Sequence, residues 1–181
     1  MIIFDTETTG LVKPTAVSLN EQPEIIELAA IKLEDKKPYK ELERIEFLCK
    51  PKYPLSAKIT EITGLTDKDL EDQPKFSAKY PYLCEFFRGE FYLIGHNVKF
   101  DVDLLSFELQ RMGRLTKFPW PPMHICTVEA TVSRKGFRLN QGLLYEELFG
   151  DIIKSAHRAM ADVEVLVKIT KELIKTKEIQ L

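Results

Sequence analysis

The first ten residues, MIIFDTETTG, place two carboxylates at the end of an apolar strand. Ile2, Ile3 and Phe4 are typical of a strand that enters the protein interior. Asp5 and Glu7 follow two positions apart, and side chains two apart on a strand point to the same face. Two neighbouring carboxylates at the end of a buried strand repel each other and resist desolvation. The fold must therefore contain something that offsets this repulsion.

Length and composition set broad limits on the class of protein. A chain of 181 residues with a net charge of −2 is long enough for one substantial core, and we expect a single domain over residues 1–181. The charge argues against a protein that coats long nucleic acids by counterion release, although not against one that binds only a chain end. Cys49, Cys84 and Cys126 lack any Cys-x-x-Cys spacing and are expected to be free thiols in a reducing compartment. No leader-like segment and no apolar run of about 20 residues is present, so we expect a cytoplasmic protein without a membrane span.

The pattern of apolar residues predicts a mixed α/β sheet with helices against it. Residues 13–23 form a polar loop, and residues 24–34 and 41–50 form a strand hairpin across the turn at 35–40. Short helices are expected over 56–72, joined at Gly64, and a helical stripe follows over 76–87, where Pro81 should kink or restart the helix. The remaining predicted elements are a strand over 90–97, a helix over 98–113, a short strand at 123–127, small helices, and a longer helix from about 157 to 175.

Four acidic residues occupy the strand ends and helix starts of this arrangement. Asp101 begins the helix after the strand 90–97, and Asp162 lies in the first turns of the last helix. Taken alone, Asp101 is explained by the helix dipole and Asp162 by solvent. Together with Asp5 and Glu7, they form a set of oxygen ligands suited to hard divalent cations. Two such ions about 3.5–4 Å apart act on both the attacking and the leaving oxygen of a phosphodiester. We therefore expect two divalent cations, Mg²⁺ or Mn²⁺, at this site.

Histidines and other charged residues extend the hypothesis. His157 precedes Asp162 by five residues and is placed to act as a general base beside a metal-bound water. His96 either binds substrate or supports the strand end. Asp103 is expected to be solvated, because helix residues two apart do not face each other. The stretch 133–139, SRKGFRL, either binds phosphates and a base or forms a solvated loop.

Three segments carry a resemblance to a known family. FDTETTG with Asp5 and Glu7, HNVKFD with Asp101, and HRAMAD with His157 and Asp162 resemble the three motifs of the DEDDh 3′–5′ exonucleases, which include the proofreading epsilon subunit of bacterial replicative DNA polymerase. EITGLTD at 61–67 and LLYEELFG at 143–150 are similar to further segments of that family. The resemblance implies a ribonuclease H-like fold, with three antiparallel and two parallel strands in a mixed sheet flanked by helices.

The resemblance also implies a role for each site residue. Asp5, Glu7 and Asp162 would hold the catalytic metal, with Asp5 also contacting the second one. Asp101 would act through metal-bound water, and His157 would be the general base. The 3′-terminal nucleotide would contact a set of substrate-binding residues that comprises Thr8, Leu65, His96, Asn97 and Phe100.

Three functions remain open from the sequence. The leading one is metal-dependent removal of nucleoside monophosphates from the 3′ end of single-stranded DNA, as a proofreading activity that would work with a DNA polymerase. The second is an exoribonuclease or oligonucleotide scavenger on the same fold, because no motif residue reports on the 2′-hydroxyl group. The third is a non-catalytic binding or polymerase accessory module, which predicts a lost carboxylate or histidine, and none of the five is lost.

Overall fold

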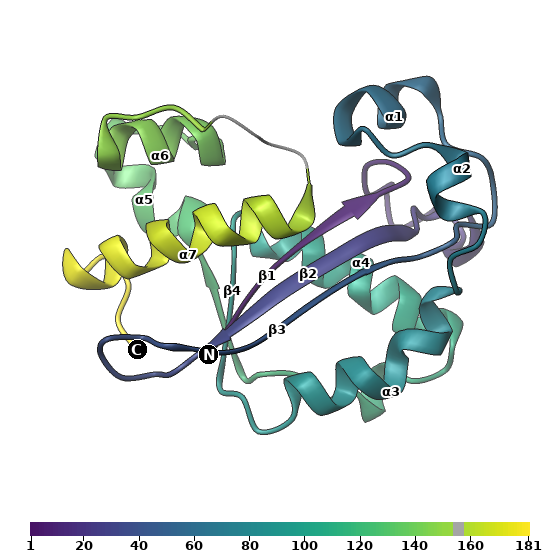
Figure 1. Ribbon diagram of the computed structural model, residues 1–181, viewed down its shortest axis with the longest axis horizontal. Coiled ribbons are helices and arrows are strands. Elements are labelled where there is room, and N and C mark those ends of the chain that lie inside the picture. The colour runs from purple at the N-terminus through teal and green to yellow at the C-terminus, as the bar shows by residue number, and fades with distance from the viewer. Residues whose placement is uncertain (154–157) are drawn as a thin grey trace.

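A five-stranded mixed sheet forms the centre of the protein, shown in a computed structural model that describes residues 1–153 and 158–181 (Figure 1). The strands are β1 (Ile2–Thr8), β2 (Ile25–Leu33), β3 (Glu41–Leu48), β4 (Tyr92–Gly95) and β5 (Met123–Cys126), in the spatial order β3-β2-β1-β4-β5. β1, β2 and β3 pair antiparallel, and β4 and β5 continue the sheet in parallel. This arrangement confirms the predicted mixed sheet and its hairpin.

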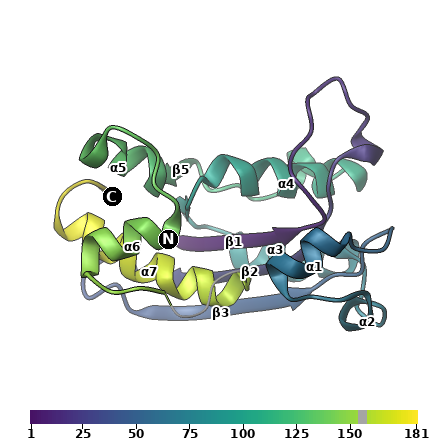
Figure 2. The same ribbon diagram turned by 90° about the horizontal axis from the view of Figure 1, so that it is seen from above.

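Alternation along β1 determines what each face of the sheet contacts. Ile2 and Phe4 pack into one apolar cluster with residues of α3 (Phe76–Phe87) and α4 (Val98–Arg111). Met1 and Ile3 pack into a second cluster with α7 (Ala159–Lys175). The helices therefore form two layers with the sheet between them (Figures 1 and 2), and each side chain of β1 belongs to one of these layers by its position in the strand.

The long helices follow the predicted apolar stripes. Ala159, Val163, Leu166, Thr170 and Leu173 of α7 are all buried. The restart expected at Pro81 does not occur, because α3 continues through this residue as one helix. Buried residues of α3 lie on both sides of the proline, and their packing outweighs the loss of one backbone hydrogen bond.

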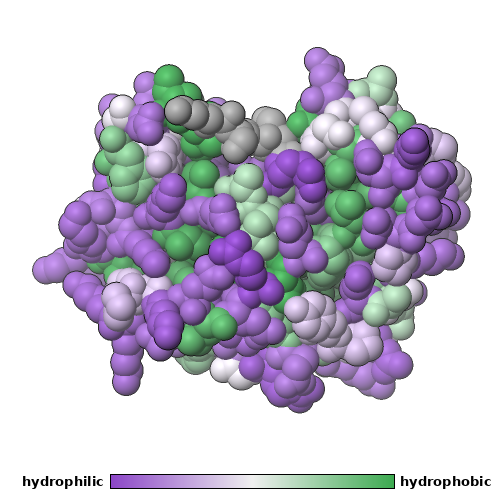
Figure 3. Space-filling view, viewed as in Figure 1, coloured by the Kyte–Doolittle hydropathy of each residue, from purple (hydrophilic) through white to green (hydrophobic). Residues whose placement is uncertain are grey.

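The remaining helices are short. They are α1 (Ala57–Thr63), α2 (Asp67–Leu70), α5 (Thr127–Lys135), α6 (Gln141–Phe149) and the 3₁₀ turns η1 (Leu19–Glu21) and η2 (Leu115–Lys117). Gly64 ends α1 with a φ of 71°, as expected for the residue that joins two short helices. Hydrophilic side chains cover much of the face that carries α7 and β3 (Figure 3). Within the described residues, no helix has the length and apolar character needed to cross a membrane.

Candidate active site

Three carboxylates meet between the end of β1 and the start of α7. One carboxylate oxygen of each of Asp5, Glu7 and Asp162 lies within 4.8 Å of the others. Asp5 and Glu7 continue the row of Met1 and Ile3 that faces α7, and Asp162 lies in the first turn of that helix. The pairing of β1 with β2 shifts register between Glu7 and Thr8, as is common where a strand ends beside a functional site. The sequence prediction that these three residues converge therefore agrees with their positions.

Asp101 reaches the same region from the opposite layer. It lies in the first turn of α4 and is only 2% exposed. Its Oδ1 accepts a hydrogen bond from the Thr6 backbone N–H at 3.0 Å and another from the Thr6 hydroxyl at 2.7 Å. Because Thr6 lies between Asp5 and Glu7 and points to the other face, it ties Asp101 to the strand that carries the first two acids.

The pKa values of Asp5, Glu7 and Asp101 are raised by their surroundings. Burial, followed by repulsion from Asp101, Asp162 and Glu7, raises the pKa of Asp5 well above its usual value. Burial and the charge of Asp162 raise the pKa of Glu7 to about 7. The pKa of Asp101 is also raised to about 7, mainly by burial, although the two hydrogen bonds from Thr6 oppose this shift. Near neutral pH, Glu7 and Asp101 are therefore only partly ionised, and nearby positive charge would favour their ionised forms.

A divalent cation fits this cluster on chemical grounds. The three converging side chains offer oxygen ligands, which Mg²⁺ and Mn²⁺ prefer. The same positive charge would reverse the mutual repulsion that raises the pKa values of Asp5 and Glu7. A bound divalent cation would thus offset the repulsion between two adjacent carboxylates at a buried strand end.

An ion pair that the sequence analysis missed fixes the start of α7. Glu27 of β2 lies opposite Glu7 and is 0% exposed. Its Oε1 accepts from Nη2 of Arg158 at 2.8 Å, and its Oε2 accepts from the Ala159 backbone N–H at 3.2 Å. These contacts attach the entry of α7 to the strand beside Glu7, so they help to position Asp162. The sequence does contain a signal for this pair. Glu27 is an acid inside the apolar run EIIELAAIKL, and a buried carboxylate needs a partner.

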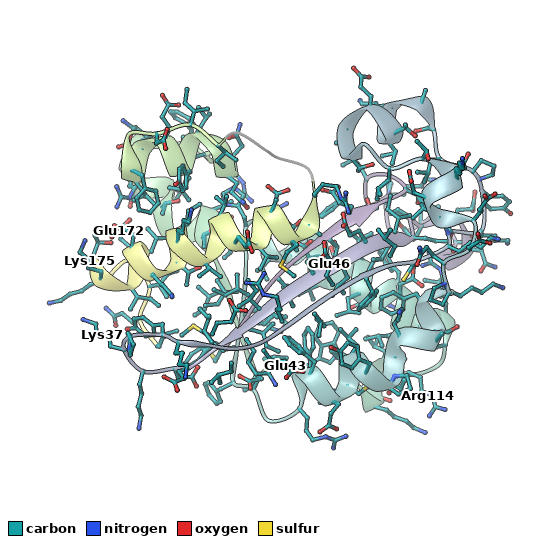
Figure 4. The ribbon with its side chains drawn as sticks, viewed as in Figure 1. Lys37, Glu43, Glu46, Arg114, Glu172 and Lys175 are labelled. Carbon is teal, nitrogen blue, oxygen red and sulfur yellow. The ribbon has the colours of Figure 1, made fainter. Side chains whose placement is uncertain are left out.

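Further acids surround Arg158. Its pKa is raised, first by the hydrogen bond to Glu27 and then by the charges of Glu27, Glu46 and Glu7. Figure 4 shows Glu46 on the sheet near the start of α7. Arg158 in turn opposes the upward shift of the Glu7 pKa. This guanidinium is therefore a fixed positive charge at the edge of the carboxylate cluster.

A cleft of about 380 Å³ opens beside Glu7. Its lining includes Thr8 and Phe100, two of the predicted substrate-binding residues, together with Ile59 and Ile62 of α1. The Thr8 hydroxyl donates to the Gly10 carbonyl at 2.7 Å, which orders the chain as it leaves β1. Leu65 is not among the lining residues, because it is 3% exposed and packs with Ile26 and Leu70.

His96 and Asn97 lie at the end of β4, held by residues of the α5–α6 region. The two ring nitrogens of His96 contact the Thr127 hydroxyl at 2.9 Å and the Leu139 carbonyl at 3.1 Å. Burial lowers the pKa of His96 to about 4, so the ring is neutral at physiological pH. Asn97 has a φ of 66° and accepts from Nη2 of Arg138 at 3.0 Å. Of the two roles considered for His96, these contacts favour support of the strand end.

The basic stretch 133–139 is largely paired with acids. Arg134 binds Glu178, Lys135 Nζ lies 2.9 Å from Glu147, and Arg138 pairs with Glu129. Phe137 is exposed. A phosphate would have to compete with these carboxylates for each cation, and this favours the solvated-loop interpretation. Asp103 pairs with Lys99 on the surface of α4, in agreement with its expected solvated role.

His157, the predicted general base, lies outside the described residues.

Comparison with protein families gives an independent result. Residues 2–170 match the exonuclease family designated RNase T. The chain belongs to this exonuclease family.

The relatives of this exonuclease are much longer proteins, and the match covers one part of each. The exonuclease is 30% identical over 191 residues to the DNA polymerase III PolC-type of Caldanaerobacter subterraneus subsp. tengcongensis, covering 98% of this chain and 12% of that protein. It is 31% identical over 190 residues to the PolC-type polymerase of Bacillus cereus, covering 96% of this chain and 12% of that protein. The exonuclease therefore spans about an eighth of the length of these relatives.

Solved structures share its fold. The nuclease domain of 3′hExo, a DEDDh family member bound to rAMP, superposes with a TM-score of 0.79 at 16% identity, covering 99% of this chain and 94% of that one. Exonuclease X in complex with 5′ overhanging duplex DNA gives a TM-score of 0.69 at 21% identity, covering 99% and 93%. The predicted ribonuclease H-like fold is thus confirmed, and the match to the exonuclease family agrees with the resemblance of the three motifs to 3′–5′ exonucleases.

Proposed function

We propose that this exonuclease removes nucleoside 5′-monophosphates from the 3′ end of single-stranded DNA and depends on two divalent cations, Mg²⁺ or Mn²⁺. The observation that carries the proposal is the convergence of Asp5, Glu7 and Asp162 within 4.8 Å beside a cleft large enough for a nucleotide. The similarity to PolC-type polymerases supports DNA as the substrate and a proofreading role with a polymerase as the partner. A replicative role in turn supports a cytoplasmic location. We further propose that residues 1–181 constitute one exonuclease domain.

The proposed roles follow the positions of the residues. Asp5, Glu7 and Asp162 would hold the ions, and Asp101 would bind through water from the opposite side. Bound divalent ions polarise phosphoryl oxygens and lower the pKa of water. Thr8 and Phe100 would contact the terminal nucleotide in the cleft that they line, whereas roles for Leu65, His96 and Asn97 in substrate binding stay predictions. An imidazole nitrogen of His157 would take one proton from the attacking water. The water oxygen would bond to phosphorus as the P–O3′ bond breaks, which releases the monophosphate, and the leaving O3′ would take up a proton from solvent to become the new 3′-hydroxyl of the strand.

One assay tests the proposal and its RNA alternative together. DNA and RNA strands of equal sequence, each labelled at the 5′ end, are incubated with Mn²⁺ or Mg²⁺ and resolved by length. We expect a ladder that shortens from the 3′ end on DNA and disappears with chelator. The RNA strand is included because one structural neighbour was solved with rAMP. Faster digestion of RNA than of DNA would identify RNA as the substrate. Cleavage of circular single strands, or activity in chelator, would contradict the proposed reaction.

A further inference from the structure

A second hollow, of about 470 Å³, adjoins the catalytic cleft. Both are lined by Thr9, Gly10, Leu11 and Ser56, so the two hollows adjoin and a strand bound in the cleft lies within reach of the second hollow. One wall is the loop between β1 and β2, which rises beside α4 and α1 (Figure 2). The other wall is formed by Lys52, Tyr53 and Pro54, which precede α1.

The loop wall is rigidly attached at its base. Gln22 is buried, and its amide exchanges two hydrogen bonds with the Lys13 backbone, at 2.9 Å to the N–H and 3.1 Å to the carbonyl. The guanidinium of Arg111 on α4 donates to the carbonyls of Leu19, Gln22 and Pro23 at 3.2, 2.7 and 3.0 Å. A preformed wall lowers the conformational entropy lost when a ligand binds.

The opposite wall presents an exposed aromatic ring. Tyr53 is 63% exposed, and Lys52 Nζ lies 5.1 Å from the centre of its ring. Leu11 is also exposed in the loop. The charges in the hollow nearly balance, because Lys13 and Lys52 face Glu21 and Glu24. Glu21 accepts from Ser18, and Glu24 accepts from the Lys52 backbone N–H. Such a surface suits the faces of nucleobases better than a run of phosphates, since stacking on aromatic rings depends little on base identity.

We propose that this hollow is a subsite for the nucleotides on the 5′ side of the terminal one, with a base stacked on Tyr53. The proposal rests on the proposed function for the direction in which the strand runs. It predicts that substrates longer than the catalytic cleft gain affinity from Tyr53, whereas a single nucleotide does not. It also predicts little sequence preference at this position, because every base offers an aromatic face.

The test measures binding and hydrolysis separately. Tyr53→Ala is compared with the parent and with Tyr82→Ala, a control that removes an exposed tyrosine from α3. Binding of a fluorescent ten-nucleotide oligothymidylate is measured by anisotropy in chelator, where no digestion occurs. Hydrolysis of thymidine 5′-monophosphate p-nitrophenyl ester is measured with Mn²⁺. Base–aromatic stacking predicts that Tyr53→Ala weakens oligonucleotide binding by about 5- to 150-fold and leaves ester hydrolysis unchanged, with Tyr82→Ala like the parent on both. Tyr53→Phe keeps the ring and should bind like the parent.

The outcomes distinguish the subsite from the proposed function. Equal oligonucleotide affinity in Tyr53→Ala and the parent would overturn the subsite while leaving the exonuclease activity standing. Loss of ester hydrolysis in Tyr53→Ala would also overturn it, because Tyr53 would then act at the catalytic cleft. Binding that depends on Tyr53 in a protein that hydrolyses neither substrate would support the subsite and contradict the proposed reaction.

Discussion

Replacing Asp162 by asparagine should stabilise the metal-free exonuclease while abolishing its activity. The substitution keeps the shape of the side chain and removes one charge from the cluster with Asp5 and Glu7. Two unit charges at 4.8 Å, the upper limit of the separations in this cluster, repel by about 3.5 kcal/mol at an effective dielectric constant of 20. Protonation, partial exposure and salt reduce this value, so we expect a gain of about 1–3 kcal/mol in the free energy of unfolding. For a protein of this size that is an increase of roughly 3–10 °C in melting temperature.

The gain should depend on pH with a defined sign. Because the folded-state pKa of Glu7 is raised from 4.5 to about 7, the folded protein retains a proton that the unfolded chain releases between these values. The contribution of Glu7 protonation to the free energy of unfolding is therefore fully present below pH 4.5 and is lost as the pH rises through 7. The variant removes part of the repulsion that causes this loss. Its advantage over the parent should be larger at about pH 8.5 than at about pH 5.5.

Melting curves in chelator and in Mn²⁺ test this reasoning. A ligand at a hundred times its dissociation constant stabilises the state it binds by about 2.7 kcal/mol, so the parent should gain more from Mn²⁺ than the variant. Asp72→Asn, at an exposed position after α2, is the control and should melt like the parent. A variant that is less stable than the parent in chelator, with equal gains from Mn²⁺ in both proteins, would show that Asp162 does not belong to a metal-binding cluster.

Four further variants have expected results. Asp5→Ala should abolish single-strand digestion, whereas His157→Ala should reduce kcat by about 10²–10⁴-fold, the usual contribution of a general base; the reverse order would mean that the base is misassigned. Arg158→Met leaves the buried carboxylate of Glu27 without a paired cation. Calorimetry should therefore show a loss of about 3 kcal/mol in the free energy of unfolding, and titration should show a weaker affinity for Mn²⁺. Unchanged values would refute the positioning role of Arg158. The double variant Lys135→Ala and Arg138→Ala should bind single strands like the parent across a salt series, because both cations already pair with acids; a shallower salt dependence would assign them to phosphates.

The sequence predicted the elements and the acids because these depend on local patterns. The alternation of apolar residues in β1 and the spacing of helical stripes are set by strand and helix geometry, which the residues themselves report. The same alternation explains why Asp5 and Glu7 lie together and why both face the helix that carries Asp162. These positions follow from chain order and from the layers of the fold.

What the sequence did not predict depends on contacts between distant segments. The pairing of Glu27 with Arg158 joins residues 131 positions apart, and no local pattern identifies that partner. The bonds from Thr6 to Asp101 and from Arg111 to the loop carbonyls are of the same kind. Leu65 illustrates the converse, because its motif resembles a substrate-binding segment while its side chain packs in a small apolar cluster.

The central claim is that the carboxylate cluster binds divalent ions. Titration of Mn²⁺ into the protein, monitored by electron paramagnetic resonance, tests it most directly, because the measurement reports ion binding without requiring catalysis. The parent should bind two Mn²⁺ ions, and Asp5→Asn, which alters the carboxylate proposed to contact both, should lose this binding while remaining folded by circular dichroism. Absence of Mn²⁺ binding in the parent, or equal binding in parent and variant, would contradict the assignment of Asp5, Glu7 and Asp162 as the metal site of this exonuclease.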